Sequence, residues 1–358
     1  MRADGVLYVK KIMGRGNPIC VGADGITYVK YTRNKEPMKD LTKGYPAKVI
    51  ILFAIPMIFG SIFQQLYNIA DSKIVSTFVG TEAFAAVGAT SVVSNTLIGF
   101  LNSLTLGFAI PIANSFGGKD YKRMRRMVAG TVLLTLAGAV VLTMLILLLI
   151  PTILKLLATP EDIMSPALAY VRIILYGIIF VSVYNMCANV LRAVGDSRTP
   201  LYCLIISVFV NIGLDLLFVN GFHMGIEGAA WATILSQALS ALLCLGYILL
   251  KFRDIIPEKE EWKPVEGQYS ELLTTGLAMG FMSLVVNFGT IVLQGAINGL
   301  GTAIVAAHTA ARKVFDIFTV SLYCLGNAMT TFVSQNMGAG EPMRIRRGIR
   351  HAMVMATG

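Results

Sequence analysis

The chain has 358 residues, of which 55% are hydrophobic and only 14% charged, and its mean hydropathy is +0.69. Soluble domains carry about 25% charged residues, so this composition excludes an ordinary soluble protein. In lipid, backbone hydrogen bonds must close within helices, and we therefore predict an all-α polytopic membrane protein. The formal net charge of +10 would suit nucleic acid. The basic residues instead lie mostly between apolar runs, so no nucleic-acid partner is expected.

The first segment, residues 1–40, differs from the rest of the chain. It is polar, contains several glycines and has no apolar run of signal-peptide length. Only LYVKK and ITYVKY are typical of short strands. We expect a flexible N-terminal extension, and we interpret Met38 as the natural start of the protein.

Eight apolar runs follow, each near or above the roughly 20 residues that cross a bilayer. They occupy 49–79, 84–110, 127–150, 167–191, 200–219, 225–250, 270–298 and 303–333. A ninth begins near Ile349. Cysteines inside these runs lack metal-ligand spacing, so we interpret them as packing residues: Cys187, Cys203, Cys244 and Cys324.

Lys and Arg alternate between the connections of these runs. The N-terminal flank and the connections after runs two, four, six and eight are basic, whereas the other four contain only Lys155. Basic connections stay in the cytoplasm, so we predict a multi-pass protein of the cytoplasmic (inner) membrane with a cytoplasmic N-terminus. The polar stretch 251–269 is expected to be a cytoplasmic linker.

A weak repeat relates the two parts that this linker joins. A shift of 221 residues aligns Gly80–Arg126 with Gly301–Arg347, and places Gly117 on Gly338 and Arg123 on Arg344. An even number of spans separates the copies, so the repeat is parallel. We predict a complete six-helix N-terminal lobe over 41–250 and a partial C-terminal lobe over 270–358. By this interpretation the sequence is truncated at its C-terminus.

Polar residues inside the predicted spans indicate a function. Asp71 lies in the first span, Asn211 and Asp215 lie four apart in the fifth, and Thr233 lies in the sixth. Intramembrane carboxylates are costly and usually line an internal cavity. We therefore predict that these four residues bind a coupling proton or Na⁺. Three further residues form a weaker prediction for the substrate cavity: Gln64, Asn68 and Gln237. The same groups can instead tie helices together through hydrogen bonds.

Five other positions stand out in or near the spans. Pro56 either bends the first helix permanently or acts as a hinge. Lys73 should point about 200° away from Asp71 and extend toward the membrane surface. Arg312 and Asp316 are spaced as an ion pair, and His308 is as compatible with packing as with a cavity.

Several segments together resemble the multidrug and toxic compound extrusion (MATE) family, from about Leu41 to the end of the chain. They are QQLYNIADSKIVSTFVG, GFAIPIANSFGGKDYKRMRR, NVLRAVGDSRTP, SVFVNIGLDLLFV, GIEGAAWATILSQ and SQNMGAGEPMRIRRGIRH. The resemblance implies two six-helix lobes in a V. It also implies export of organic cations in exchange for H⁺ or Na⁺. The acidic cluster is similar to that of the DinF-like branch, in which the first-span proline is linked to bending.

We therefore predict a cation-coupled antiporter, without an enzymatic activity or a cofactor other than the coupling ion. Its expected partners are small amphipathic cations and membrane lipid, and it is expected to be a monomer. The alternatives are a flippase of lipid-linked oligosaccharides from the same superfamily, and a fragment that does not transport. An intramembrane aspartyl protease is disfavoured because its GxGD motif is missing.

Overall fold

The computed structural model describes residues 40–157, 159–298 and 302–357, together with three short strands before residue 40. Many side chains between 291 and 318, and those of residues 81 and 82, lie outside the description. The chain forms two compact units, Met1–Lys39 and Asp40–Gly358.

The first unit contains a small antiparallel sheet in the order β1-β2-β3. Its strands are β1 (Val6–Leu7), β2 (Ile19–Gly22) and β3 (Thr27–Val29). Val6 pairs with Gly22, and Cys20 pairs with Tyr28. β1 borders the first strand-like patch of the sequence and β3 lies in the second, whereas β2 was not expected. The proposed start at Met38 falls outside the described residues.

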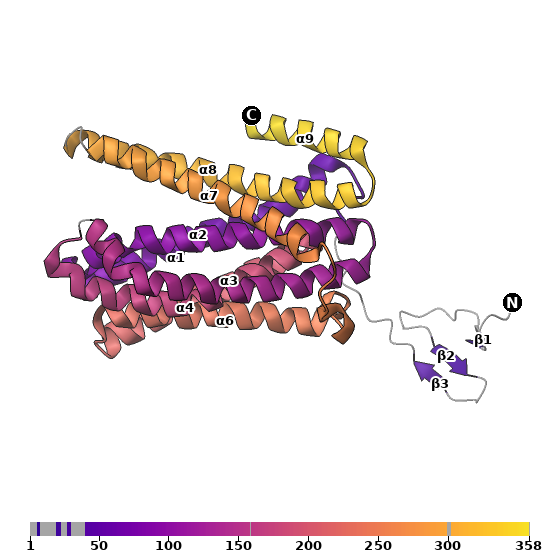
Figure 1. The fold of residues 1–358 in the computed structure, drawn as a ribbon, viewed down its shortest axis with the longest axis horizontal. Helices are drawn as coiled ribbons and strands as arrows, with labels where there is room; N and C mark the ends of the chain where they lie inside the picture. Colours follow the sequence, from indigo (N-terminus) through magenta and orange to yellow (C-terminus); the bar gives the residue numbers. More distant parts are fainter. Residues whose placement is uncertain are drawn as a thin grey trace. The chain divides into compact units, whose positions relative to one another are not determined.

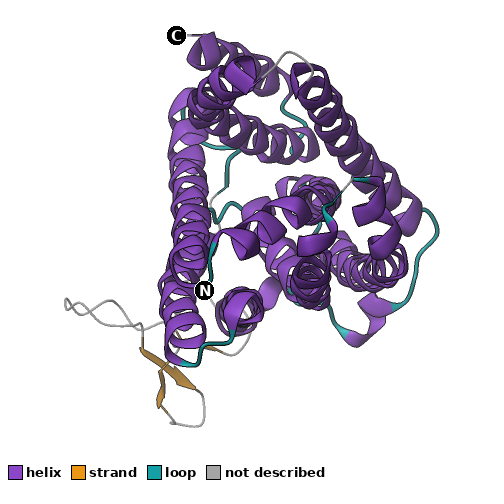
Figure 2. Ribbon diagram, turned by 90° about the vertical axis from the view of Figure 1, so that its left-hand side faces the viewer, coloured by secondary structure: helices purple, strands orange, loops and turns teal. Residues whose placement is uncertain are grey.

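The second unit is built from helices throughout its described part (Figures 1 and 2). This confirms the predicted all-α fold. The helices are α1 (Pro46–Phe78), α2 (Thr81–Gly117), α3 (Tyr121–Leu156), α4 (Glu161–Ala193), α5 (Arg198–Asp215), α6 (Gly225–Lys251), α7 (Gln268–Asn298), α8 (Thr302–Gly338) and α9 (Pro342–Thr357).

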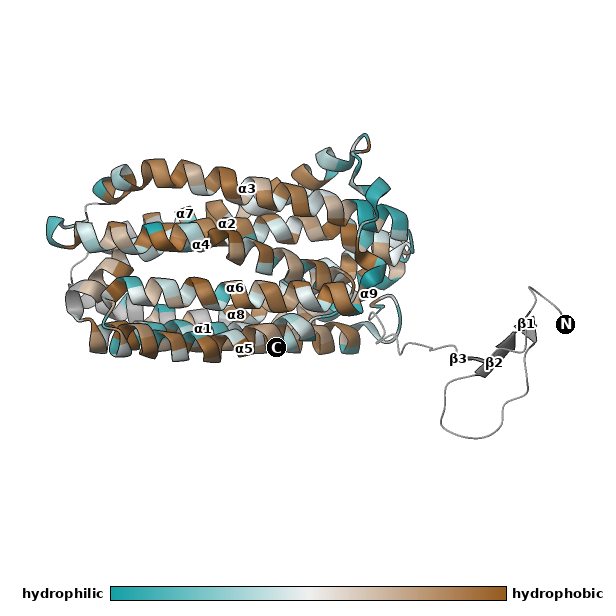
Figure 3. Ribbon diagram, turned by 90° about the horizontal axis from the view of Figure 1, so that it is seen from below, coloured by the Kyte–Doolittle hydropathy of each residue, from teal (hydrophilic) through white to brown (hydrophobic). Residues whose placement is uncertain are grey.

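Within the described residues, α1 to α7 are long and apolar enough to cross a membrane. The eighth expected span coincides with α8, whose first half is largely outside the side-chain description. Large apolar side chains remain exposed along the spans: Leu148 of α3 is 79% exposed and Leu242 of α6 is 67% exposed. Figure 3 shows these apolar stretches along the helices. A surface of this kind is covered by lipid, so the protein is a multi-pass membrane protein.

The two ends of the helix bundle differ in charge. The connections α2–α3, α4–α5, α6–α7 and α8–α9 contain the clustered Lys and Arg residues, and we call this the basic end. The other connections form the opposite end. The helices α2 and α8 continue past their predicted apolar runs to Gly117 and Gly338 at the basic end. A helix can leave the hydrocarbon and continue in the polar interface, so an apolar run marks its membrane part only.

The repeat seen in the sequence is visible in the helix boundaries. α2 and α8 have 37 residues each. The first residues of the two helices are 221 positions apart, and so are their last residues. The next helices, α3 and α9, begin at Tyr121 and Pro342, which are related by the same shift. Equivalent sequence positions therefore start and stop equivalent helices.

The expected linker is structured where the chain is described. It forms two 3-10 turns, Arg253–Ile255 and Lys259–Trp262. Glu261 is 3% exposed and accepts two hydrogen bonds from Arg125 of α3, at 2.9 and 2.7 Å. Gln268 donates to the Arg126 carbonyl oxygen at 2.8 Å. These contacts attach the segment before α7 to the start of α3.

Candidate functional site

A cavity of about 490 Å³ lies among α1, α2, α4 and α6. From α1 it is lined by Gln64, Tyr67, Asn68 and Asp71, and from α6 by Thr233 and Gln237. All three weaker cavity candidates therefore line the same cavity as Asp71 and Thr233. These lining residues of α1 recur at intervals of three or four, and Thr233 and Gln237 of α6 are four apart. Each helix therefore presents its lining residues on one face.

The helices α2 and α4 supply the other walls, which the sequence reasoning missed. From α2 the lining residues are Val87, Ser91, Ser94, Asn95, Ile98, Gly99 and Asn102, and from α4 they are Tyr170, Ile174, Gly177, Val181, Tyr184 and Asn185. The signal was available: Ser and Asn recur at helical spacing through the second predicted span. Hydroxyls and amides carry no charge, so in a membrane helix they indicate a functional site less strongly than carboxylates do.

Asp71 is the only charged side chain among the described residues that line the cavity, and no described Lys or Arg lines it. Its Oδ1 atom is buried and has no hydrogen-bond partner in the described part of the chain. An ionised carboxylate accepts hydrogen bonds and attracts positive charge, so a bound proton, a cation or a hydrogen-bond donor can satisfy this oxygen. The cavity is thus electrostatically suited to positively charged ligands.

Asp215 and Asn211 lie behind this wall. Both are on α5, which packs against α1 and α6, and both are fully buried. They do not line the cavity. Asp215 is nevertheless close enough to Asp71 for the two charges to interact. The four predicted ion-binding residues therefore divide into a cavity pair, Asp71 and Thr233, and a buried pair.

The buried pair is poorly satisfied. Both side-chain oxygens of Asp215 and both polar side-chain atoms of Asn211 are buried without a hydrogen-bond partner among the described residues. Asp215 ends α5, and a π-helical turn, Leu216–Gly221, follows it directly. π-Helical turns are rare and occur frequently at functional sites. Unpaired polar atoms in a membrane interior are costly, which argues that this pair binds something.

Tyr67 connects the walls of the site. Its hydroxyl donates to Thr233 Oγ1 at 3.1 Å, joining α1 to α6. It lies one helical turn before Asp71, on the same face of α1. The sequence reasoning missed this residue because tyrosine is common in membrane helices.

The remaining predicted positions lie away from the cavity wall. Pro56 is buried within α1, which is helical on both sides of it. Its neighbours Phe53, Ala54 and Met57 belong to a cluster with Cys324, Ala328 and Phe332 of α8. Lys73 is exposed and is not part of the cavity lining. The expected partner of Arg312, Asp316, has a side chain outside the description.

In the described part of the chain, no group of three or more His, Cys, Asp or Glu side chains is arranged to hold a metal ion. The acceptors that do gather are two carboxylates with amide and hydroxyl oxygens. Hard monovalent and divalent cations prefer oxygen ligands of these kinds. Such oxygens can accept a proton or coordinate an alkali cation.

Comparison with known proteins agrees with this architecture. The family model described as MatE matches residues 56–217 and 278–358. The chain belongs to the MATE family. Its members are transporters, so this MATE chain is a transporter and not the intramembrane protease considered from the sequence. The probable multidrug resistance protein YpnP of Bacillus subtilis is 30% identical over 310 residues, which cover 86% of this chain and 68% of YpnP.

Two solved structures extend the comparison. A MATE crystal structure in the bent conformation has a TM-score of 0.83 and 25% identity, with 88% of this chain and 70% of that chain covered. A MOP superfamily transporter from Pyrococcus furiosus has a TM-score of 0.82 and 26% identity, with 89% and 71% covered. That transporter is described as having a binding pocket of reverse polarity that suggests a different function.

Proposed function

We propose that this MATE protein exports amphipathic organic cations in exchange for H⁺ or Na⁺. The observation that carries the proposal is the 490 Å³ cavity whose charged lining residue is Asp71. The Ser, Asn, Gln and Tyr side chains around it can solvate an ammonium group, and the tyrosine rings offer cation–π contacts. The description of YpnP as a probable multidrug resistance protein supports the same substrate class.

Asp71 and Asp215 hold the coupling ion in this proposal, with Asn211 and Thr233 as hydrogen-bond partners or oxygen ligands. Two nearby carboxylates repel when both are ionised, so a bound proton or cation stabilises the pair. An arriving organic cation offers a competing positive charge at Asp71. Exchange follows when conformations open to opposite sides of the membrane differ in their affinity for the two ligands. The acidic pair also supports assignment to the DinF-like branch.

The basic end faces the cytoplasm in this account, because clustered Lys and Arg remain on that side of a membrane. The cavity residues of α1, Gln64 to Asp71, lie in the second half of that helix, toward the opposite end. Pro56 precedes them by about two turns. A bend at Pro56 would therefore move Asp71 relative to α5 and α6. The bent conformation described for a MATE crystal structure supports such a motion.

The flippase alternative calls for a different pocket. A lipid pyrophosphate needs basic groups, and within the described part of the chain no basic residue lines this cavity. The described reverse polarity of the Pyrococcus furiosus pocket illustrates that charge separates functions in this superfamily. Ethidium efflux and a lipid-linked oligosaccharide flippase assay distinguish the two activities.

Ethidium efflux from cells that express the chain tests the proposal. Asp71→Asn and Asp215→Asn are each expected to abolish efflux at unchanged membrane expression, since an amide neither holds the proton nor carries the charge. Asp162→Asn is the matched control. Asp162 is an exposed acid in the first turn of α4, at the end of the bundle away from the basic end, and it does not line the cavity. Efflux by either the Asp71→Asn or the Asp215→Asn variant at the control rate would overturn the assignment.

A further inference from the structure

The basic end of the bundle contains two equivalent arginines that each reach into the other half of the protein. Arg123 belongs to the first turn of α3, and Arg344 to the first turn of α9. They are separated by the 221 positions of the repeat. Each one leaves its own repeat: Arg123 contacts the first turn of α7, and Arg344 contacts the segment just before α1.

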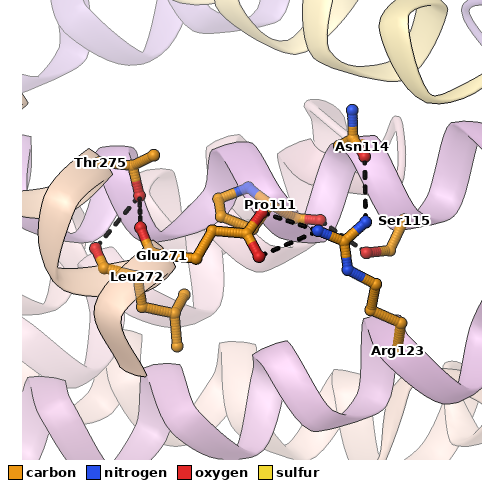
Figure 4. A network of polar contacts seen from close by, with 7 residues as sticks. All are labelled: Pro111, Asn114, Ser115, Arg123, Glu271, Leu272 and Thr275. Carbon is orange, nitrogen blue, oxygen red and sulfur yellow. Dashed lines mark hydrogen bonds and ion pairs between the residues drawn. The ribbon is translucent and has the colours of Figure 1, made fainter. Parts of the chain in front are cut away.

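Arg123 contacts α7, the first helix of the second half. Its Nη2 atom donates to both carboxylate oxygens of Glu271, at 2.7 and 2.9 Å, and Nη1 donates to Asn114 Oδ1 at 3.4 Å (Figure 4). Glu271 lies in the first turn of α7. The pair is half-exposed, with side-chain exposures of 41% and 39%.

Arg344 makes the corresponding contact with the segment before α1. It donates to the carbonyl oxygens of Gly44 at 2.6 Å and Leu41 at 3.1 Å, and its guanidinium lies 5.7 Å from the Phe332 ring centre. Gln335, the repeat equivalent of Asn114, accepts from the Leu41 backbone N–H at 3.0 Å. It also donates to the Ala193 carbonyl oxygen at 2.7 Å. The equivalent amides thus take different parts: Asn114 accepts from Arg123 directly, whereas Gln335 binds the Leu41 backbone that Arg344 also contacts.

Between the two arginines, α2 and α8 cross at equivalent glycines. A methyl group at Gly117 would overlap the Gln335 carbonyl oxygen, and one at Gly338 would overlap the Asn114 carbonyl oxygen. The contact is reciprocal under the repeat, as expected where the pseudo-twofold axis passes. Glycine is needed here because the backbones touch. In Figure 1, α2, α7 and α8 come together at the basic end. Toward their other ends, α7 and α8 lie apart from α3.

We propose that Arg123 and Arg344 are paired clamps that hold the basic end closed, and that both must release for the cavity to open toward that end. The inference rests on the proposed function to the extent that alternating access requires such opening. The clamps differ in chemistry. Arg123 binds a carboxylate, whereas Arg344 binds neutral carbonyls, so only the first can be exchanged for a reversed ion pair.

These are positioning residues, since neither lines the cavity. Half-exposed ion pairs are weak, and losing one changes an equilibrium by no more than about fivefold. This strength suits a gate, because a contact that must break in every cycle cannot be very stable. Loss of both clamps is expected to shift the ratio of open to closed basic ends by more than loss of either one.

Spin labels at Lys122→Cys and Met343→Cys, in a background without the native cysteines, measure this opening. Both positions are exposed and equivalent by the repeat. Distance distributions by double electron–electron resonance in lipid nanodiscs should gain a longer population in Arg123→Ala with Arg344→Ala. Arg346→Ala with Arg347→Ala, which removes the same charge from exposed arginines of α9, should leave the distribution unchanged.

A charge reversal protects the test against misfolding. Glu271→Arg alone breaks only the Arg123 clamp, so it should raise the longer-distance population by less than the double alanine variant does, and Arg123→Glu with Glu271→Arg should restore the closed population. An unchanged distribution in the double alanine variant, or no recovery in the reversed pair, would overturn the proposal. The readout needs neither substrate nor ion gradient, so it can fail while cation export stands, or hold while cation export fails.

Discussion

Replacing Arg125 by Met should destabilise the protein more than replacing Arg123 by Met, although both arginines lie near the start of α3. Arg125 is 22% exposed and Glu261 only 3%, and the Nε atom of Arg125 donates to both carboxylate oxygens of Glu261. Glu261 also accepts from the Glu258 backbone N–H at 2.8 Å. Without Arg125, a buried carboxylate would remain with that one N–H.

The magnitude follows from burial. Removing one partner of a buried ion pair costs about 3–5 kcal/mol, and the partial exposure of Arg125 points to the lower value. Exposed pairs contribute about 0.2–1 kcal/mol, which applies to Arg123 and Glu271. At roughly 2–4 °C per kcal/mol, Arg125→Met should lower the melting temperature by about 6–12 °C, and Arg123→Met by less than about 4 °C.

Thermal unfolding of the purified variants in the same detergent checks this difference. Arg123→Met is a matched control, because it removes the same charge from the same helix turn. Arg125→Met combined with Glu261→Gln should recover part of the loss, since no buried charge then remains. Equal melting temperatures for the two single variants would refute the claim that the linker is anchored by a buried pair.

Three further outcomes are expected. The Arg125 hydrogen bond holds the pKa of the Glu261 carboxyl below its ordinary value of 4.5. The contact therefore stabilises the fold above that pH, and this stabilisation is lost as the pH falls through the lowered pKa. In Glu261→Gln, the fall of the melting temperature at acid pH should accordingly be less steep. Gly117→Ala should cost about 1–3 kcal/mol by overpacking the α2–α8 crossing, whereas Gly88→Ala on the same helix, where nothing lies within 4 Å of an added methyl group, should be neutral or slightly stabilising in the same melts. Tyr67→Phe, which removes the hydroxyl that donates to Thr233, should slow ethidium efflux several-fold with little effect on melting, and unchanged efflux would show that this bond has no part in transport.

The membrane helices were predictable because the hydrocarbon interior of a bilayer permits few backbone structures other than helices. The first seven predicted spans fall on α1 to α7, and the 221-residue repeat reappears in the bounds of α2 and α8. Helix ends were less predictable, since both helices continue several residues into polar sequence. The structured linker was missed for a related reason: a buried Glu261 depends on Arg125, which is remote in sequence.

The site shows the same limit. Costly carboxylates such as Asp71 stand out in an apolar run, and the cavity does contain Asp71. The sequence did not distinguish residues that line the cavity from those behind it, because that depends on how α5 is rotated against α1 and α6. Asn211 and Asp215 lie one turn from each other but outside the lining. The polar faces of α2 and α4 become meaningful only when both helices are seen around one volume.

Transport by purified protein in proteoliposomes tests the central claim most directly. Ethidium movement is followed while a proton gradient and a sodium gradient are imposed separately, with the native chain and with Asp71→Asn. The account predicts that one of the two gradients drives ethidium against its own gradient in the native protein, and that Asp71→Asn abolishes this movement. Uphill transport that persists in Asp71→Asn, or ethidium movement that is independent of both ion gradients, would contradict cation-coupled export through the Asp71 cavity.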